Sequence, residues 1–194
     1  MDDPAAVAGQ LPRVAGYLAG LAVLGARLRA RGTGWFGALG LRRPVAGDAL
    51  AVALGVFAVA GLRALTYAYL AAIGAGAHVQ TGLEGFRVVN WAGVIVAVFV
   101  AAALAPVAEE VFFRGVAFKA LEARTTPLRA AFGSGALFAF ARLDVALFPF
   151  FVLYGTMLAL LYRRTNNLWV PILVRGIFDG ATTAALVWLD ISVR

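Results

Sequence analysis

Six long apolar segments constrain this chain more than any other feature of its sequence. They cover about residues 11–28, 49–74, 91–106, 128–143, 146–162 and 168–189, and the third continues as a helix to about residue 122. A membrane-crossing helix needs about 20 mainly apolar residues. Of the 194 residues, 62% are hydrophobic and 14% are charged, whereas soluble domains carry about 25% charged residues. The pattern predicts an all-α, polytopic transmembrane helix bundle of about six spans, forming a single integral membrane domain over residues 1–194.

The composition excludes several other classes of protein. A soluble domain and a disordered chain are both inconsistent with a mean hydropathy of +0.87. The chain has no Cys, so it can form neither disulfides nor thiolate metal sites. The net charge of +7 would suggest nucleic acid in a soluble protein. Here the basic residues lie between apolar segments, where Lys and Arg orient membrane spans, so we expect no nucleic-acid partner.

The distribution of Lys and Arg between the segments predicts the orientation in the membrane. One set of loops and helix ends carries ten basic residues: Arg27, Arg29, Arg31, Arg42, Arg43, Lys119, Arg124, Arg129, Arg163 and Arg164. The opposite set carries three: Arg13, Arg87 and Arg194. Because basic loops stay in the cytoplasm, both termini are expected on the non-cytoplasmic side.

Apart from the basic residues counted for the orientation, seven charged residues fall inside the apolar segments and the interior of their helical continuation. They are Arg63, Glu109, Glu110, Arg114, Arg142, Arg175 and Asp179. Such a group at the centre of a membrane helix costs about 2.5–3.5 kcal/mol on insertion scales, so it normally faces inward and is paired. We interpret Arg63 as a snorkelling side chain or an isolated interhelical contact. The other six require a joint explanation.

Their spacing predicts that three segments meet at one depth. Glu110 and Arg114 are four residues apart, and so are Arg175 and Asp179, which places each pair on one helix face. Counted from the basic turns at 1.5 Å per residue, Glu109 and Arg142 both lie about 20 Å deep, and Arg175 about 16 Å deep. The formal charges of the six sum to zero, which reduces the cost of burial. The cluster is therefore either a set of ion pairs that clamps three helices, or a reaction centre or polar ligand cavity.

Several motifs resemble those of one membrane family. The run from Glu109 to Gly115 looks like the EExxxR motif of the CPBP family, which includes the CAAX prenyl proteases and the bacteriocin-processing Abi proteins. Residues 39–44 (LGLRRP), 134–141 and 155–173 are similar to further family segments, in the same order. The resemblance covers about residues 39–43 and a motif core at about 105–180. It implies a CAAX-protease-like fold and favours the inner (plasma) membrane of a bacterium.

The chain departs from the family pattern at two positions. Where the FxxxH motif has His, this chain has Arg142, and where the HxxxN/D motif has His, it has Arg175, although Asp179 is retained. The single histidine, His78, is expected in a loop on the non-cytoplasmic side and cannot replace either one. In the family, the first glutamate activates a water molecule and the histidines assist it. Glu109 paired to arginine would be a weaker base, and a guanidinium would occupy the place of the water.

Two functions from different classes follow from the resemblance. The leading hypothesis is a catalytically degenerate member, or pseudoenzyme, that acts as a binding or assembly subunit for a membrane-protein partner or a lipid. The alternative is an active glutamate-dependent intramembrane endopeptidase of a lipidated or hydrophobic peptide, because arginine can also donate to an oxyanion. The candidate catalytic residues of such an endopeptidase are those at the family motif positions, Glu109, Glu110, Arg114, Arg142, Arg175 and Asp179. We expect no cofactor and no metal, since only carboxylates remain as ligands and arginines compete for them. A transporter is disfavoured because no inverted repeat is visible.

Overall fold

The computed structural model describes residues 11–32, 34–74 and 91–193, so His78 lies outside the described residues. In these parts of the chain all regular structure is helical, and no strand occurs. The helices that precede the third expected segment are α2 (Leu11–Ala30), α3 (Trp35–Leu39) and α4 (Ala46–Ala72). After it come α8 (Pro127–Arg142), α9 (Phe148–Thr165) and α10 (Trp169–Val193).

The third segment forms one continuous helical rod over residues 91–122. Its consecutive parts are α5 (Trp91–Phe99), η2 (Val100–Leu104), α6 (Ala105–Glu110), η3 (Val111–Phe118) and α7 (Lys119–Glu122). The two η segments are wider turns of π-helix. Such turns are inserted into α-helices most often at functional sites, and η3 begins directly after Glu110.

The all-α membrane fold predicted from the sequence is confirmed, and each of the six expected segments is a helix. Within the described ranges, two helices are long and apolar enough to cross a membrane, Ala46–Ala72 and Gly93–Glu122. α8 has only 16 residues, just below the usual length of a span. Large side chains such as Leu54, Phe57 and Leu65 are more than half exposed on α4, as expected for a face in contact with lipid.

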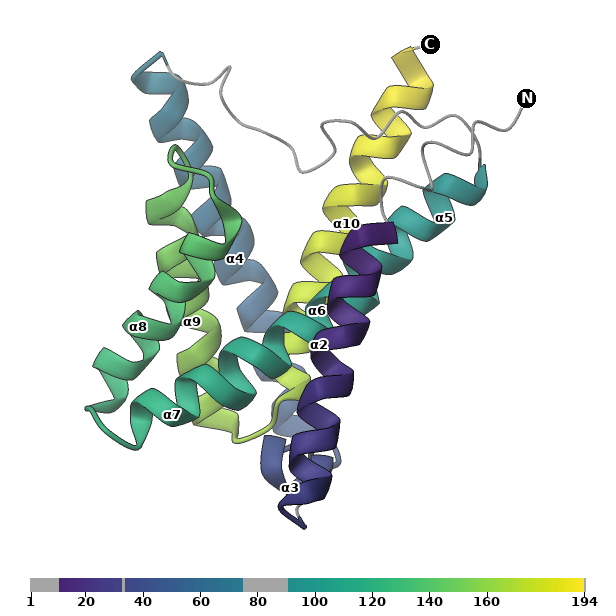
Figure 1. The fold of residues 1–194 in the computed structure, drawn as a ribbon. Coiled ribbons are helices and arrows are strands. Elements are labelled where there is room, and N and C mark those ends of the chain that lie inside the picture. Colours follow the sequence, from purple (N-terminus) through teal and green to yellow (C-terminus); the bar gives the residue numbers. More distant parts are fainter. Residues whose placement is uncertain (1–10, 33, 75–90, 194) are drawn as a thin grey trace.

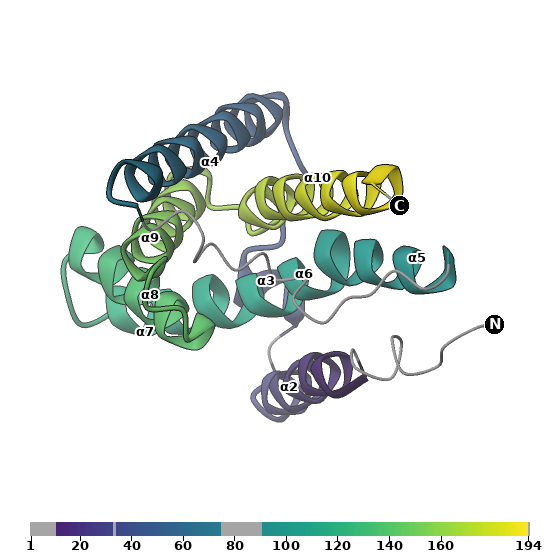
Figure 2. The same cartoon turned by 90° about the horizontal axis from the view of Figure 1, so that it is seen from above.

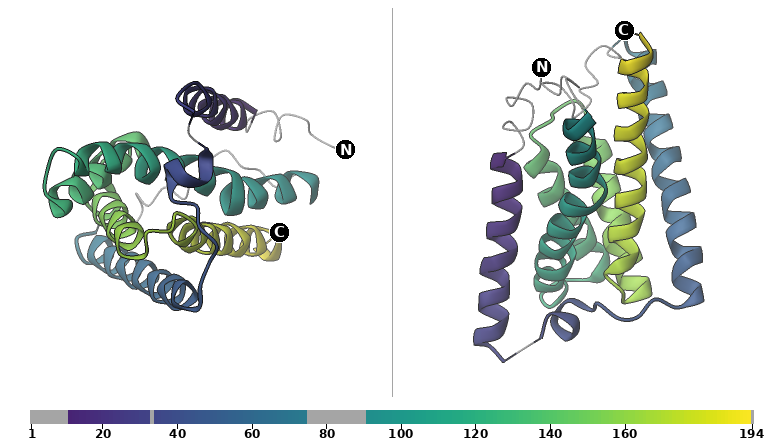
Figure 3. Two further views of the ribbon diagram at one scale, coloured as in Figure 1. Left: turned by 90° about the horizontal axis from the view of Figure 1, so that it is seen from below. Right: turned by 90° about the vertical axis from the view of Figure 1, so that its right-hand side faces the viewer.

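The helices run between two ends of the molecule (Figures 1 and 3). The turns after α2, α7 and α9 lie at the lower end in Figure 1, whereas the C-terminal ends of α8 and α10 lie at the upper end. Seen from above, α4, α9 and α8 lie on one side, and the rod and α10 lie beside them, with α2 outermost next to the rod (Figure 2). The basic helix ends that we expect in the cytoplasm are therefore grouped at the lower end.

Two glycine contacts bring the helices that carry the charged residues close together. A Cβ added to Gly155 of α9 would lie 2.7 Å from Cα of Gly135 on α8, so these two backbones touch. On α10, Gly176 and Gly180 are four residues apart and both pack on Ala102 of η2. Small residues at this spacing allow close approach of membrane helices. They place Arg175 and Asp179, the neighbours of these two glycines, beside the rod.

A polar cluster joins the start of α4 to the turn between α9 and α10. Arg42 donates to Asp48 Oδ1 and to the carbonyl of Thr165, each at 2.9 Å. Asn167 donates to Asp48 Oδ2 at 3.0 Å, and the backbone N–H of Leu168 donates to the carbonyl of Gly40. These contacts satisfy buried polar groups at the basic end and set where α10 begins.

Candidate functional site

Glu110 and Arg114 form the innermost ion pair of the molecule's charged cluster. They face the same side of the rod across the first turn of η3, and Arg114 Nη1 lies 2.8 Å from Glu110 Oε1. Both side chains are fully buried. Arg114 Nη2 also donates to the carbonyl of Gly155 on α9 at 2.9 Å, so the pair ties the rod to the close α8–α9 contact.

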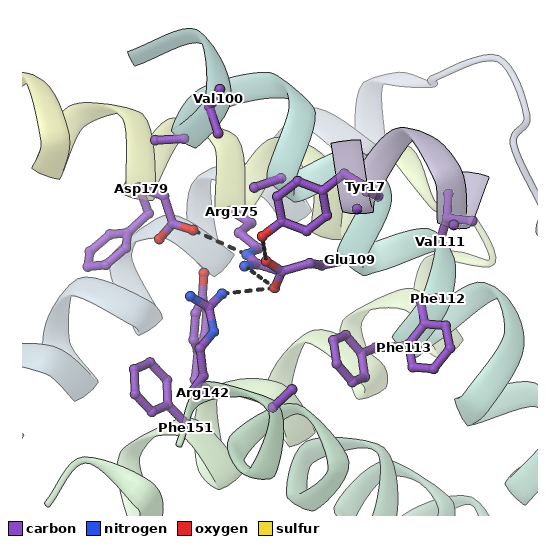
Figure 4. Close-up of a pocket in the computed structure, with 18 of the residues that line it drawn as sticks. Tyr17, Val100, Glu109, Val111, Phe112, Phe113, Arg142, Phe151, Arg175 and Asp179 are labelled. Carbon is purple, nitrogen blue, oxygen red and sulfur yellow. Dashed lines mark hydrogen bonds and ion pairs between the residues drawn. The ribbon is translucent and has the colours of Figure 1, made fainter. Parts of the chain in front are cut away.

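Glu109 has three donors around its carboxylate (Figure 4). The Tyr17 hydroxyl of α2 donates to Oε1 at 2.6 Å. Arg142 and Arg175 donate to Oε2, at 2.9 Å and 2.5 Å. Both carboxylate oxygens are thus engaged, and only 14% of the side chain is exposed.

Arg175 connects all three carboxylates. Besides Glu109, it contacts Glu110 Oε1 through Nη1 at 3.3 Å and Asp179 Oδ2 through Nε at 3.1 Å. Its side chain is 1% exposed. The planar guanidinium offers five N–H groups in a fixed fork, which suits it to several acceptors at once.

The ring of Phe138 lies among the three arginines. Its centroid is 5.2 Å from the guanidinium carbon of Arg114, 4.8 Å from that of Arg142 and 4.9 Å from that of Arg175. Phe138 is completely buried. The negative face of an aromatic ring attracts cations, so this side chain fills the space between like charges without adding repulsion.

The structure therefore brings together all six residues singled out from the sequence, and the prediction that three segments meet at one depth is confirmed by these contacts. They are Glu109, Glu110, Arg114, Arg142, Arg175 and Asp179. Their role, catalytic or structural, is a separate question. Arg63 makes the interhelical contact that we considered, because its guanidinium lies 5.5 Å from the ring of Phe178 on α10.

A cavity of about 1240 Å³ opens beside the charged cluster. Its polar wall includes Tyr17, Glu109, Arg142, Arg175 and Asp179, which Figure 4 labels. Its apolar wall comes from α2, the rod and α9, and includes Leu21, Leu24, Phe112, Val116 and Phe150. The volume exceeds the range of about 300–1000 Å³ that is typical of small-molecule sites, and it can accept a long apolar group.

Two residues of this site escaped the reasoning from sequence. Tyr17 lies in the first apolar segment, and only the fold shows that its hydroxyl reaches Glu109, 92 positions away. Tyr154 lines the cavity, and its hydroxyl is buried without a hydrogen-bond partner in the described part of the chain. A tyrosine in an apolar span is a weak signal, because its ring packs like any other aromatic side chain.

The chemistry open to the cluster follows from its donors. A general base needs a free lone pair within hydrogen-bond reach of the proton that it abstracts, and both oxygens of Glu109 accept hydrogen bonds from the protein. Among the described residues, no group of three or more His, Cys, Asp or Glu side chains could hold a metal ion. What the geometry does provide is a fixed cluster of opposite charges at the wall of a large apolar cavity.

One stretch of the chain, which contains the charged cluster, is similar to a known protein family. Searches among curated proteins and among solved structures found no match. In a scan of family models, residues 90–181 match the family described as type II CAAX prenyl endopeptidase Rce1-like. This range contains the whole charged cluster, from Glu109 to Asp179, together with Phe138. On this match, residues 90–181 of the chain are similar to the Rce1-like CAAX prenyl endopeptidase family.

Proposed function

We propose that this chain is a family member without peptidase activity, which binds an apolar partner from the membrane in its cavity. The observation that carries the proposal is the state of Glu109, whose two oxygens accept hydrogen bonds from Tyr17, Arg142 and Arg175. In the CPBP mechanism that the sequence resembles, this glutamate activates water. Here three protein donors already use most of the roughly four acceptor positions of the carboxylate.

The two arginines also oppose base catalysis electrostatically. An opposite charge in contact with a carboxylate stabilises its ionised form and weakens it as a base. Arg175 is almost completely buried and bridges three carboxylates, so a movement away from Glu109 would also break its contacts with Glu110 and Asp179. Two guanidinium groups at positions that resemble the family's histidine positions therefore favour a structural cluster.

The cavity supports the binding part of the proposal. Its wall joins an apolar part, formed by side chains such as Phe112 and Val116, to the charged cluster. The partners that fit are a lipid, a hydrophobic or lipidated peptide, or a segment of another membrane protein, and nucleic acid is not among them. The proposal also places the chain in the inner membrane of a bacterium as a multi-pass protein with both termini outside the cytoplasm, on the basis of the ten basic residues at one end.

A peptidase assay on the purified chain tests this proposal. A prenylated CAAX-type peptide and an apolar peptide are incubated with the protein and with Glu109→Gln as the matched control. We expect no turnover by either form and no effect of added zinc. The protein's melting temperature in detergent, measured in parallel, shows whether each sample is folded.

The opposite result supports the alternative function, a glutamate-dependent endopeptidase. One observation favours it besides the family match: Arg142 is 33% exposed at the cavity, where its guanidinium could stabilise an oxyanion. Cleavage by the unmodified protein that disappears in Glu109→Gln would establish this function and overturn the one proposed here.

A further inference from the structure

Arg63 is a cation in the cavity wall without a carboxylate partner among the described residues. It lies within α4, one of the two helices able to cross a membrane. Its Nε donates to the Tyr67 hydroxyl at 2.7 Å, and its guanidinium carbon lies 5.2 Å from that ring. Among the described residues it forms no ion pair. Ionisable groups inside a membrane are normally paired, and unpaired ones mark ligand sites.

The carboxylates of the same cavity are already occupied. Glu109 is held by Arg142 and Arg175, and Asp179 by Arg175. Asp144 accepts a hydrogen bond from the backbone N–H of Leu147 at the start of α9. Within the described part of the cavity wall, no carboxylate is therefore paired with Arg63.

A buried tyrosine, Tyr154, lies behind this part of the cavity wall. Tyr154 is 3% exposed, and its buried hydroxyl has no hydrogen-bond partner in the described ranges. Its ring lies 6.5 Å from the ring of Phe178, the same ring that lies 5.5 Å from the guanidinium of Arg63. Arg63, Tyr67, Tyr154 and Phe178 all line the cavity. We call these four residues the Arg63 corner.

We propose that the Arg63 corner binds the phosphate of an anionic phospholipid, whose acyl chains occupy the apolar part of the cavity. This rests on the proposed function, since it names the class of ligand that the cavity takes. A guanidinium with free N–H groups and a tyrosine hydroxyl are donors suited to phosphate oxygens. The apolar wall, with Leu21 and Leu24 of α2 opposite Phe112 of the rod, suits acyl chains.

The depth of Arg63 distinguishes this site from general attraction of lipid to the basic end. Arg63 lies nine residues before the end of α4, about 14 Å along the helix axis. That end lies opposite the basic turns (Figure 1). A headgroup at Arg63 is therefore inside the bundle, on the far side from Arg129 and the other exposed arginines.

Native mass spectrometry of the full chain in detergent tests the proposal, with phosphatidylglycerol and phosphatidylcholine of identical acyl chains as probes. Both lipids offer the same phosphate to Arg63, but phosphatidylcholine also brings a quaternary ammonium, which repels the guanidinium. We therefore expect phosphatidylglycerol to bind about tenfold more tightly. Arg63→Gln should abolish the preference, and Arg63→Lys should retain most of it. Arg129→Gln, which removes an exposed arginine at the basic end, should leave it unchanged.

Tyr67→Phe keeps the proposal testable if Arg63→Gln fails to fold. The Tyr67 hydroxyl accepts a hydrogen bond from Arg63 Nε and can donate its own proton to a phosphate oxygen, so its removal should lower the binding of phosphatidylglycerol severalfold at an unchanged melting temperature. A purely structural tyrosine would lose stability and leave binding unchanged.

Three results would overturn the inference. The first is equal binding of the two lipids, and the second is an equal loss of the lipid preference in Arg129→Gln and Arg63→Gln. The third is displacement of phosphatidylglycerol by an equal concentration of inorganic phosphate or of a peptide with a free C-terminal carboxylate. Each of these leaves the peptidase assay unaffected. Conversely, cleavage that depends on Glu109 would overturn the proposed function and leave the lipid measurement to stand by itself.

Discussion

At the scale of the residue, the single guanidinium of Arg175 holds the charged cluster together. Arg175 contacts Glu109, Glu110 and Asp179, and it is nearly inaccessible to solvent. Three carboxylates and three arginines give a cluster of zero formal charge, and a balanced cluster is the least costly way to bury ions. The stability of the cluster therefore depends on the balance and on Arg175 more than on any one pair.

Replacing Arg175 by alanine should destabilise the protein strongly. The cluster then carries one uncompensated buried negative charge, and breaking a buried ion pair costs about 3–5 kcal/mol. We expect Arg175→Ala to lower the melting temperature in detergent far more than Arg63→Ala, because Arg63 makes no ion pair with the described residues. Arg163→Ala is a second control, since its pair with Glu122 is half exposed and such pairs contribute about 1 kcal/mol or less. Similar losses in all three variants would argue against an inward-facing network.

The sequence predicted this cluster because its charges could be counted from identifiable turns. Glu109, Arg142 and Arg175 came out at similar depths from a rise of 1.5 Å per residue, and the structure joins them. Tyr17 could not be found in this way, since no sequence rule states which face of α2 packs on the rod. The choice between base and ion pair for Glu109 also depends on the positions of its donors, which only the fold provides.

At the scale of the element, the contact between α8 and α9 positions groups of the charged cluster. Gly155 touches Gly135, and its carbonyl accepts the hydrogen bond from Arg114. Phe138, one turn after Gly135, places its ring among the three arginines. The close glycine contact and the position of the charged groups are therefore coupled.

Gly155→Ala should destabilise the protein by about 1–3 kcal/mol, the usual cost of overpacking a close contact. The added methyl group would lie 2.7 Å from the backbone of Gly135, so α8 and α9 must separate and shift the carbonyl that Arg114 uses. Gly61→Ala on α4 is the matched control, because its added Cβ meets nothing within 4 Å. The measurement is the melting temperature of both variants in detergent. If Gly155→Ala is as stable as Gly61→Ala, the two helices are not in backbone contact.

The long helices could be predicted from the sequence, whereas their irregular parts could not. The expected segment at 128–143 is α8 at residues 127–142, and the segment at 49–74 is α4 at residues 46–72. Hydrophobic length fixes such helices because the bilayer leaves no alternative for the backbone. The wide turns of η2 and η3 have no comparable signal, and α3 lies between the first two expected segments, outside any predicted helix. These parts depend on packing, as where Leu39 of α3 fills the space beside Gly115.

At the scale of the whole molecule, charge and apolar surface are divided between the two ends and the sides of the bundle. The turns after α2, α7 and α9 lie at one end in Figure 1 and carry most of the basic residues. The loop between α8 and α9 lies at the other end, where Leu143 and Val145 are about 90% exposed and no basic residue occurs between Leu143 and Leu147. One end thus suits an anionic cytoplasmic leaflet, and the other suits the opposite side of the membrane.

This asymmetry predicts the orientation, which single-cysteine labelling can measure because the chain has no native Cys. Gly34→Cys introduces a thiol in the turn after α2, at the basic end, and Val145→Cys introduces one in the exposed loop at the opposite end. We expect a membrane-impermeant maleimide added to intact cells to label Cys at 145 and not at 34, and to label both after the membrane is opened. Labelling of position 34 alone from outside would reverse the orientation and place both termini in the cytoplasm. Because the Arg63 corner lies toward the end opposite the basic turns, the same result would also move the proposed lipid site from the outer to the inner leaflet.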